Sequence, residues 1–267
     1  MAAVRPAVAV AAKITTHPLF PVQPAKTKLS VPADATQLAP AGLKPTLTAP
    51  ELPLLDVDFC GECLPFNQTD VVDRWKHVFT LFRPQARDLG SLRQRADAFF
   101  PIIDPLLEKY DIPDDFRYVP LAESGLNARA VSRSGAAGYW QLMPATARAL
   151  GLRVSGRIDE RFNILKASEA ACRYLRRLYD QLGSWSLVAA AYNAGPTLLA
   201  NQLKRTDHRD YYRLRLPRET RYYLYRVLVY KEVLSRPDDY SSFLLPAPQT
   251  AWWPGRAGLV IRPYRIG

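Results

Sequence analysis

A single glutamate, Glu123, comes directly after residues 118–122, which are apolar apart from the hydroxyl of Tyr118. Apolar surroundings disfavour the charged form of a carboxyl group, so such a group tends to keep its proton near neutral pH. A protonated carboxyl that can release its proton is a general acid. The competing interpretation is a solvated or capping residue, which is the more common role of a lone glutamate near a helix end.

The residues after Glu123 have side chains that suit the lining of a sugar-binding groove. Hydroxyl groups, two aromatic rings and one amide follow within eighteen positions: Ser132, Ser134, Tyr139, Trp140 and Gln141. Flat rings can stack on a sugar ring, and hydroxyl and amide groups can bond to its hydroxyls. Each signal alone is weak, because such serines are typical of a loop and such a tryptophan of a core.

Glycoside cleavage commonly employs two carboxyl groups, one as the acid and one as a nucleophile or base. The other acidic candidates are Asp159, Glu160 and Glu219. The first two adjoin Arg161, which is typical of a structural ion pair or cap. Glu219 opens a predicted helix, where a carboxylate interacts favourably with the helix N-terminus. The sequence therefore permits a mechanism with one carboxyl group.

Several motifs occur in an order that resembles a known family, the lytic transglycosylases with a goose-type-lysozyme-like catalytic domain. Within this family, the motifs look most like the membrane-bound lytic murein transglycosylase D type. The motifs are Glu123-Ser124, Ala-x-Ser-x-x-Gly-Ala-x-Gly (130–138), Tyr-Trp-Gln-Leu-Met-Pro (139–144), Asp-Glu-Arg-Phe (159–162), Ala-Ser (167–168), Ala-Ala-Tyr-Asn-Ala-Gly (190–195) and Leu-Pro-Arg-Glu-Thr-Arg-Tyr-Tyr (216–223). The resemblance extends from about residue 58 to about residue 235.

The resemblance implies non-hydrolytic cleavage of peptidoglycan. Glu123 would protonate the oxygen of the β-1,4 bond between N-acetylmuramic acid and N-acetylglucosamine. As a carboxylate it would then take the proton of the muramoyl 6-hydroxyl, which closes a 1,6-anhydro ring while the N-acetyl group of the substrate stabilises the developing charge. No cofactor or metal is expected. The alternatives are a lysozyme-type muramidase that admits water and a non-catalytic wall-binding protein.

The resemblance also assigns roles to further side chains. The expected substrate-binding residues are Ser124, Ser132, Ser134, Tyr139, Gln141, Tyr192, Asn193 and Tyr223. Tyr192 would point its hydroxyl toward Glu123 or the reacting sugar, and Tyr223 would close the cleft from the last long helix. The alternative for both tyrosines is a buried ring between helices. The amides would bind sugar hydroxyls or the acetamido group, the serines would supply loop hydrogen bonds, and Tyr139 would form a groove wall where relatives often carry Leu.

Composition favours an anionic partner. The 267 residues include 36 Lys and Arg against 25 Asp and Glu, a formal net charge of +11. Such an excess suits nucleic acid, an acidic membrane surface or an acidic wall polymer. The positive charge is spread through the chain and is not gathered in one run, so we expect peptidoglycan strands as the partner, no nucleic acid, and a monomer.

Proline and helical periodicity divide the chain into three parts. Residues 1–57 are rich in Pro and Ala, which predicts an extended leader or linker. Residues 58–235 form the expected catalytic domain, mainly α and lysozyme-like, with a core at 110–205. Residues 236–267 are expected to be an irregular tail without a LysM repeat, although Trp252 and Trp253 could add wall affinity. Predicted helices cover about 70–82, 91–110, 112–123, 144–150, 165–182, 185–192, 196–204 and 217–234.

Localisation follows from the resemblance and not from the N-terminus. No run of 18 apolar residues exists, and the apolar stretch at the start is too short for a good secretory signal. Export to the periplasm or cell envelope is therefore implied only by the family, with the leader either a tether to a membrane or a segment without function. Cys60 and Cys63 are expected to be a local disulfide or two free thiols, incidental to function.

Overall fold

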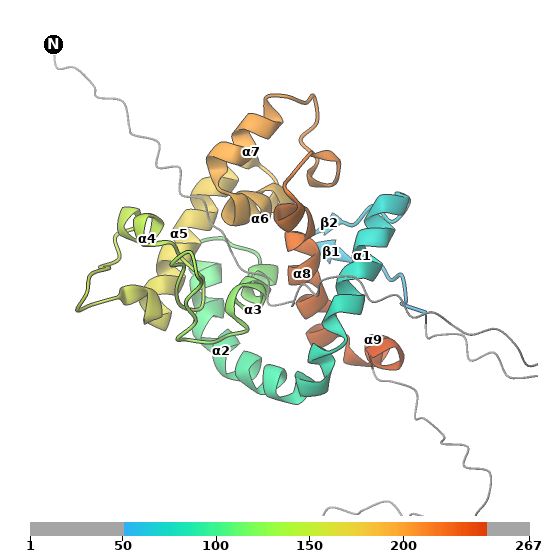
Figure 1. Ribbon diagram of the computed structural model, residues 1–267, viewed down its shortest axis with the longest axis horizontal. Coiled ribbons are helices and arrows are strands. Elements are labelled where there is room, and N and C mark those ends of the chain that lie inside the picture. Colours follow the sequence, from blue (N-terminus) through green and yellow to red (C-terminus); the bar gives the residue numbers. More distant parts are fainter. Residues whose placement is uncertain (1–50, 245–267) are drawn as a thin grey trace, which may run out of the picture.

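Helices dominate the computed structural model, which describes residues 51–244 (Figure 1). The α-helices are α1 (Thr69–Phe82), α2 (Leu89–Lys109), α3 (Val119–Ser124), α4 (Pro144–Ala149), α5 (Ile164–Leu182), α6 (Trp185–Ala194), α7 (Pro196–Leu203), α8 (Arg218–Ser235) and α9 (Pro237–Leu244). Short 3-10 turns are η1 (Gln85–Asp88), η2 (Asp114–Tyr118), η3 (Glu160–Phe162) and η4 (Tyr211–Arg213). The strands β1 (Asp58–Phe59) and β2 (Glu62–Cys63) pair antiparallel. The prediction of a mainly α fold is confirmed for these residues.

Helix α8 occupies the middle of the structure and organises the site. It contacts α1, α3 and α6, and Figure 1 shows α1 on one side of it and α3 on the other. Residues Tyr223–Tyr230 of α8 are all buried. A helix that is buried on every face must be enclosed by other elements. Because α3 packs against α8, the end of α3 that carries Glu123 lies beside the first turns of α8.

Local signals in the sequence determine several of the helix ends. Gly125 and Gly183 end α3 and α5 in the left-handed conformation, with φ of 59° and 66°. The Ser184 side chain caps α6 by accepting from the backbone nitrogen of Leu187. Pro144 and Pro196 open α4 and α7, positions where the missing N–H costs nothing. These ends agree with the predicted helix boundaries to within two residues.

Helix α2 differs from its prediction at the start. It begins at Leu89, because η1 leads straight into it, and Ser91 is not its cap. The Ser91 hydroxyl instead accepts a hydrogen bond from Arg95 at 2.8 Å. Pro101 and Pro105 lie inside the helix, and the ribbon of α2 changes direction along its length (Figure 1). A bend of this kind is expected where proline removes a backbone donor.

The β1–β2 hairpin fixes the start of α6. Glu62 accepts hydrogen bonds from the backbone nitrogens of Trp185 at 2.5 Å and Ser186 at 3.1 Å. A carboxylate at this position satisfies donors that the helix leaves open and complements its dipole. Cys60 and Cys63 in the same hairpin are free thiols, so the disulfide alternative is wrong.

The tail is not irregular from residue 236, because Pro237–Leu244 forms α9. Proline and two acidic residues begin the helix, and its buried aromatic residues hold it in place. The ring of Tyr240 stacks on Phe79 of α1 with centroids 4.9 Å apart. Trp252 and Trp253 lie outside the described residues, as do residues 1–50 of the predicted leader. Within residues 51–244, no helix has both the length and the apolar character needed to cross a membrane.

Candidate active site

Glu123 lies at the end of α3 and is 8% exposed. The hydroxyl of Tyr223 on α8 donates a hydrogen bond to Glu123 Oε1 at 2.6 Å. The other oxygen, Oε2, is buried and has no hydrogen-bond partner among the described residues. A buried polar atom without a partner is costly to a fold, so it calls for an explanation, of which a catalytic role is one. A carboxyl with one anchored oxygen and one unpaired oxygen is suited to deliver a proton.

Burial raises the pKa of Glu123 from its usual 4.5 to about 7. The hydrogen bond from Tyr223 and the charge of Arg226 act in the opposite direction and lower this pKa, while the charge of Glu219 raises it. A general acid that must later act as a base works best with a pKa near the working pH. The environment of Glu123 meets that requirement, as the apolar segment before it predicted.

Arg226 is a site residue that the sequence analysis missed. Its side chain is buried, and its guanidinium lies over the Tyr223 ring at 5.5 Å from the centroid. The stacking holds the ring that in turn holds Glu123, and it brings a cation near the carboxyl. The signal was present in the sequence, because residues three positions apart on a helix share a face and Arg226 follows Tyr223 at that spacing.

The hydrogen bonds of the two tyrosines differ from those predicted. Tyr223, expected to close the cleft, is the residue that contacts Glu123. Tyr192, expected to point at Glu123 or at sugar, donates its hydroxyl to the backbone oxygen of Trp140 at 2.6 Å. Both rings are buried between helices. The order of the motifs along the chain could not decide which tyrosine reaches the acid, because the packing of α3 against α8 decides it.

Three of the predicted sugar-binding residues hold the loop after α3. The amide nitrogen of Gln141 donates to the backbone oxygens of Ala130 at 3.2 Å and Gly138 at 2.8 Å. Ser124 Oγ lies 3.0 Å from the backbone oxygen of Tyr139, and Ser132 Oγ accepts from the backbone nitrogen of Ala136. These bonds fix the conformation of the loop. The three side chains therefore help to position the site.

The buried side chain of Arg161 also holds this loop. Its guanidinium donates to the backbone oxygens of Gly135 at 2.6 Å and Leu142 at 2.9 Å. Asp159 pairs with Arg161, and Glu160 pairs with Arg153 and Lys166. Asp159 and Glu160 therefore have the structural roles that their position beside Arg161 predicted. Their hydrogen bonds to cationic side chains lower the pKa of both carboxyls.

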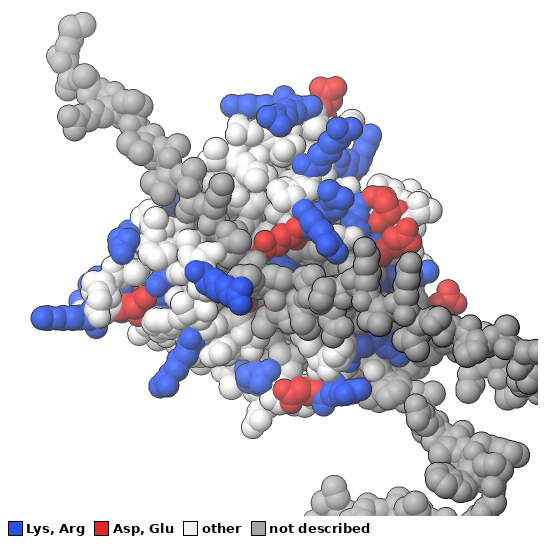
Figure 2. Space-filling view, in the orientation of Figure 1, with Lys and Arg blue, Asp and Glu red and all other residues white. Residues whose placement is uncertain are grey.

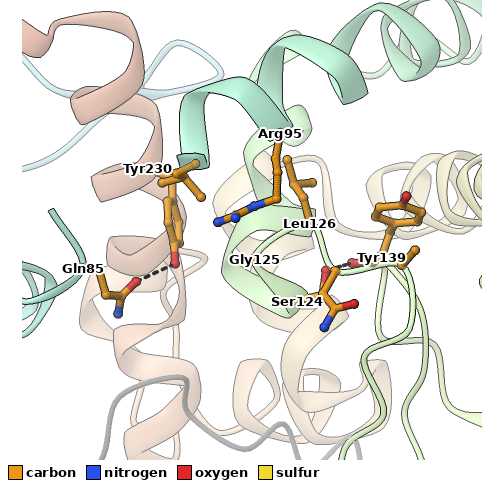
Figure 3. Close-up of a pocket in the computed structure, with 10 residues that line it drawn as sticks. Gln85, Arg95, Ser124, Gly125, Leu126, Tyr139 and Tyr230 are labelled. Carbon is orange, nitrogen blue, oxygen red and sulfur yellow. Dashed lines mark hydrogen bonds between the residues drawn. The ribbon is translucent and has the colours of Figure 1, made fainter. Parts of the chain in front are cut away.

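A cavity of about 600 Å³ begins one residue after Glu123 (Figure 3). Its lining comes from η1, α2, α8, and α3 with the loop after it: Gln85, Leu92, Arg95, Ser124, Gly125, Leu126, Asn127, Ala128, Tyr139 and Tyr230. Two predicted substrate-binding residues, Ser124 and Tyr139, are among them. The Tyr139 ring packs on Phe99 with centroids 4.9 Å apart, which fixes it as a wall.

The remaining predicted residues lie away from this cavity wall. Asn193 is buried at the end of α6, and its amide nitrogen is 3.5 Å from Glu219 Oε1. Ser134 is half-buried in the loop to which Arg161 is hydrogen-bonded. Across residues 51–244, no group of three or more His, Cys, Asp or Glu side chains is arranged to hold a metal ion. The structure thus gathers Glu123, Tyr223 and Arg226 at one point, with the cavity beside it.

Comparison with known proteins shows which protein families this sequence resembles. Residues 102–214 match the family profile of the Transglycosylase SLT domain. The chain is 30% identical over 157 residues to the membrane-bound lytic murein transglycosylase D of Escherichia coli K12, covering 57% of this chain and 35% of that protein. It is 40% identical over 101 residues to the peptidoglycan transglycosylase gp16 of Escherichia phage T7, covering 37% of this chain and 8% of that protein.

Among solved structures, the lytic transglycosylase Slt of Pseudomonas aeruginosa, an inactive mutant, matches with a TM-score of 0.42 and 24% identity over 51% of this chain and 24% of that one. The chain spans about a third of the length of the D-type relative that it matches. The family assignment rests on the sequence matches and not on this structural likeness. Residues 102–214 therefore resemble the Transglycosylase SLT domain, and the sequence matches indicate similarity to a lytic murein transglycosylase of the membrane-bound D type.

Proposed function

We propose that this chain is a peptidoglycan lytic transglycosylase in which Glu123 is both acid and base. The observation that carries the proposal is the buried Glu123 carboxyl, anchored by Tyr223 at 2.6 Å, with its second oxygen unpaired and with the next residue, Ser124, in the wall of a cavity. The pKa of about 7 allows this group to be protonated before the reaction and to regain a proton after it. The names of the relatives support the substrate class.

In the proposed reaction, the proton of Glu123 passes to the oxygen that links muramic acid to N-acetylglucosamine, and the bond from that oxygen to the anomeric carbon breaks. The muramoyl 6-hydroxyl then bonds to the anomeric carbon and its proton passes to the Glu123 carboxylate. Atoms balance without water, and the enzyme ends in its starting protonation state. An internal hydroxyl is favoured as nucleophile because it has a high effective concentration.

The proposal needs no second carboxyl group. Asp159 and Glu160 are committed to ion pairs with Arg161, Arg153 and Lys166. Glu219 is near enough to raise the pKa of Glu123, and it lies in the first turn of α8. Its contribution is electrostatic, since it favours the protonated form of the acid.

The products of purified peptidoglycan digestion test the proposal. We expect mass spectrometry to find disaccharide–peptides that end in 1,6-anhydromuramic acid, 18 mass units lighter than the hydrolysis products because no water enters. Borohydride reduction is the control, since it modifies reducing ends and leaves anhydro ends unchanged. Products that are reduced by borohydride would assign the chain to the lysozyme-type hydrolases, and an undigested wall would indicate a binding protein.

Tyr223→Phe removes the hydrogen bond that lowers the pKa of Glu123. We expect kcat to fall about tenfold, because the acid loses its orientation. The alkaline limb of the pH–rate profile should move to higher pH, since the carboxyl then holds its proton more tightly. Tyr211→Phe is the matched control: its hydroxyl is also buried and also bonded to α8, but to the backbone oxygen of Thr220. If the alkaline limb of the pH–rate profile of Tyr223→Phe stays at its wild-type position, Tyr223 does not lower the pKa of Glu123.

Location and partners follow from the same proposal. A transglycosylase acting on murein requires export, so we propose the cell envelope as its location and peptidoglycan strands as its partner, with the N-terminal segment as a tether to a membrane. On the face shown in Figure 2, Lys and Arg side chains are spread over the surface and outnumber acidic ones. Such a field draws the enzyme to an anionic wall without a dedicated binding stripe.

A further inference from the structure

The cavity beside Glu123 has two chemically different ends. One end is formed by Tyr139 and the loop after α3, and its wall includes Ser124, the residue after the acid. The other end is formed by Arg95 of α2, Gln85 of η1 and Tyr230 of α8. Figure 3 shows the Arg95 guanidinium extending between Tyr230 and Gly125, with Gln85 beyond Tyr230. We infer that the Arg95 end binds a carboxylate of the peptide stem that muramic acid carries, an inference that rests on the proposed function.

Arg95 is not neutralised by the protein. Its Nη1 donates to the Ser91 hydroxyl at 2.8 Å, which orients the guanidinium and leaves its positive charge uncompensated. The salt bridges formed within residues 51–244 do not include Arg95, and the residues that line the cavity include no Asp or Glu. A cation in a concave wall without an anion near it favours an anionic ligand.

A neutral donor accompanies the cation. Tyr230 donates its hydroxyl to Gln85 Oε1 at 3.1 Å, which uses the carbonyl of that amide and leaves its nitrogen as a donor. Burial raises the pKa of Tyr230 to about 12, and the charges of Arg226 and then Arg95 oppose this rise, so Arg95 lies near Tyr230. One guanidinium and one amide nitrogen match the two oxygens of a carboxylate.

The position of the cavity selects the source of the carboxylate. Ser124, the residue after the acid, is in the cavity wall, so a strand bound at Glu123 can place a group attached near the cleaved bond in the cavity. In a peptide-bearing glycan strand the sugars are uncharged, and the nearest carboxylates are those of the peptide joined to the lactyl group of the same muramic acid. A carboxylate attached to the bound strand has a high effective concentration at the cavity, and a free anion does not.

The test is cleavage of soluble glycan fragments by wild type and Arg95→Gln. On fragments with native peptide stems, we expect Arg95→Gln to raise KM about fivefold with kcat unchanged, the size expected for an ion pair made by an exposed arginine. On fragments whose stem carboxylates have been converted to amides, the two enzymes should have equal KM. Arg87→Gln, an exposed arginine on η1 that does not line the cavity, is the matched control and should behave as wild type on both.

Each other outcome overturns the inference. Equal KM values on native stems would show that Arg95 binds no substrate charge. A difference that persists on amidated stems would assign Arg95 to packing. A difference that persists on strands stripped of their peptides, which expose a lactyl carboxylate, would make that group the ligand instead of the stem. Failure of wild type to cleave any fragment would refute the proposed function, which is a separate result from a failure of Arg95 to discriminate.

Discussion

Glu123→Gln should lower turnover of peptidoglycan about 10³-fold, within the range that a general acid–base group contributes. Gln has the shape of Glu and its carbonyl can still accept the bond from Tyr223, which is 2.6 Å long in the wild type. It has no proton of suitable acidity to donate to the glycosidic oxygen. The measurement is the rate of anhydro-product release at saturating substrate. Turnover within a few-fold of wild type would remove Glu123 from the mechanism.

The structure supplies a matched control for this substitution. Glu232 is also buried, also accepts a tyrosine hydroxyl, from Tyr240 at 2.8 Å, and also has one oxygen without a hydrogen-bond partner. It does not line the cavity beside Glu123. Glu232→Gln should therefore leave turnover unchanged. Equal loss in both variants would mean that buried glutamate–tyrosine pairs serve folding and that Glu123 has no special chemistry.

Glu123→Gln should also change how the stability of the protein depends on pH. The folded-state pKa of Glu123, about 7, is above its usual 4.5, so the folded protein holds this proton more tightly than the unfolded chain does. The stabilisation is complete below pH 4.5 and is lost as the pH rises to 7, a change of about 3 kcal/mol. Glu123→Gln removes this dependence. As the pH rises from 4.5 to 7, the free energy of unfolding of the variant should therefore increase relative to that of wild type. Parallel curves in urea titrations would contradict the raised pKa.

Gly138→Ala should destabilise the protein by about 3–5 kcal/mol. Gly138 has φ of +77°, and a Cβ there would lie 2.0 Å from the backbone oxygen of Arg161. Either the loop or Arg161 must move, and both hold the site: Gly138 accepts from Gln141, and Arg161 binds Gly135 and Leu142. Urea denaturation measures the loss, and turnover should fall with it.

Gly135→Ala separates the clash from backbone strain. Gly135 is in the same loop with φ of +87°, yet a Cβ there meets no atom within 4 Å. Only the left-handed conformation is penalised, so we expect a loss of about 1 kcal/mol. If both substitutions cost the same, the contact with Arg161 is not what requires glycine at 138.

Local chemistry could be predicted from the sequence. Helix ends at Gly125, Gly183 and Ser184 follow from side-chain and backbone preferences of single residues, which act over one turn. The same holds for the carboxyl itself: the apolar run before Glu123 predicted its burial, and burial is the main cause of its raised pKa. The missed helix at Pro237–Leu244 depended on a distant partner, because Tyr240 needs Phe79 to pack on.

Tertiary packing decided which side chains meet. Tyr223 reaches Glu123 across 100 positions of the chain because α3 lies against α8, while Tyr192, nearer in sequence, is held by the backbone of Trp140. Arg226 lies in the site because it is on α8 next to Tyr223, and α8 packs against α3. By itself the sequence determined the candidate acid and its apolar setting, because these depend on neighbours in the chain. Which tyrosine orients the acid and which arginine faces the cavity depend on distances between helices, which only the folded core fixes.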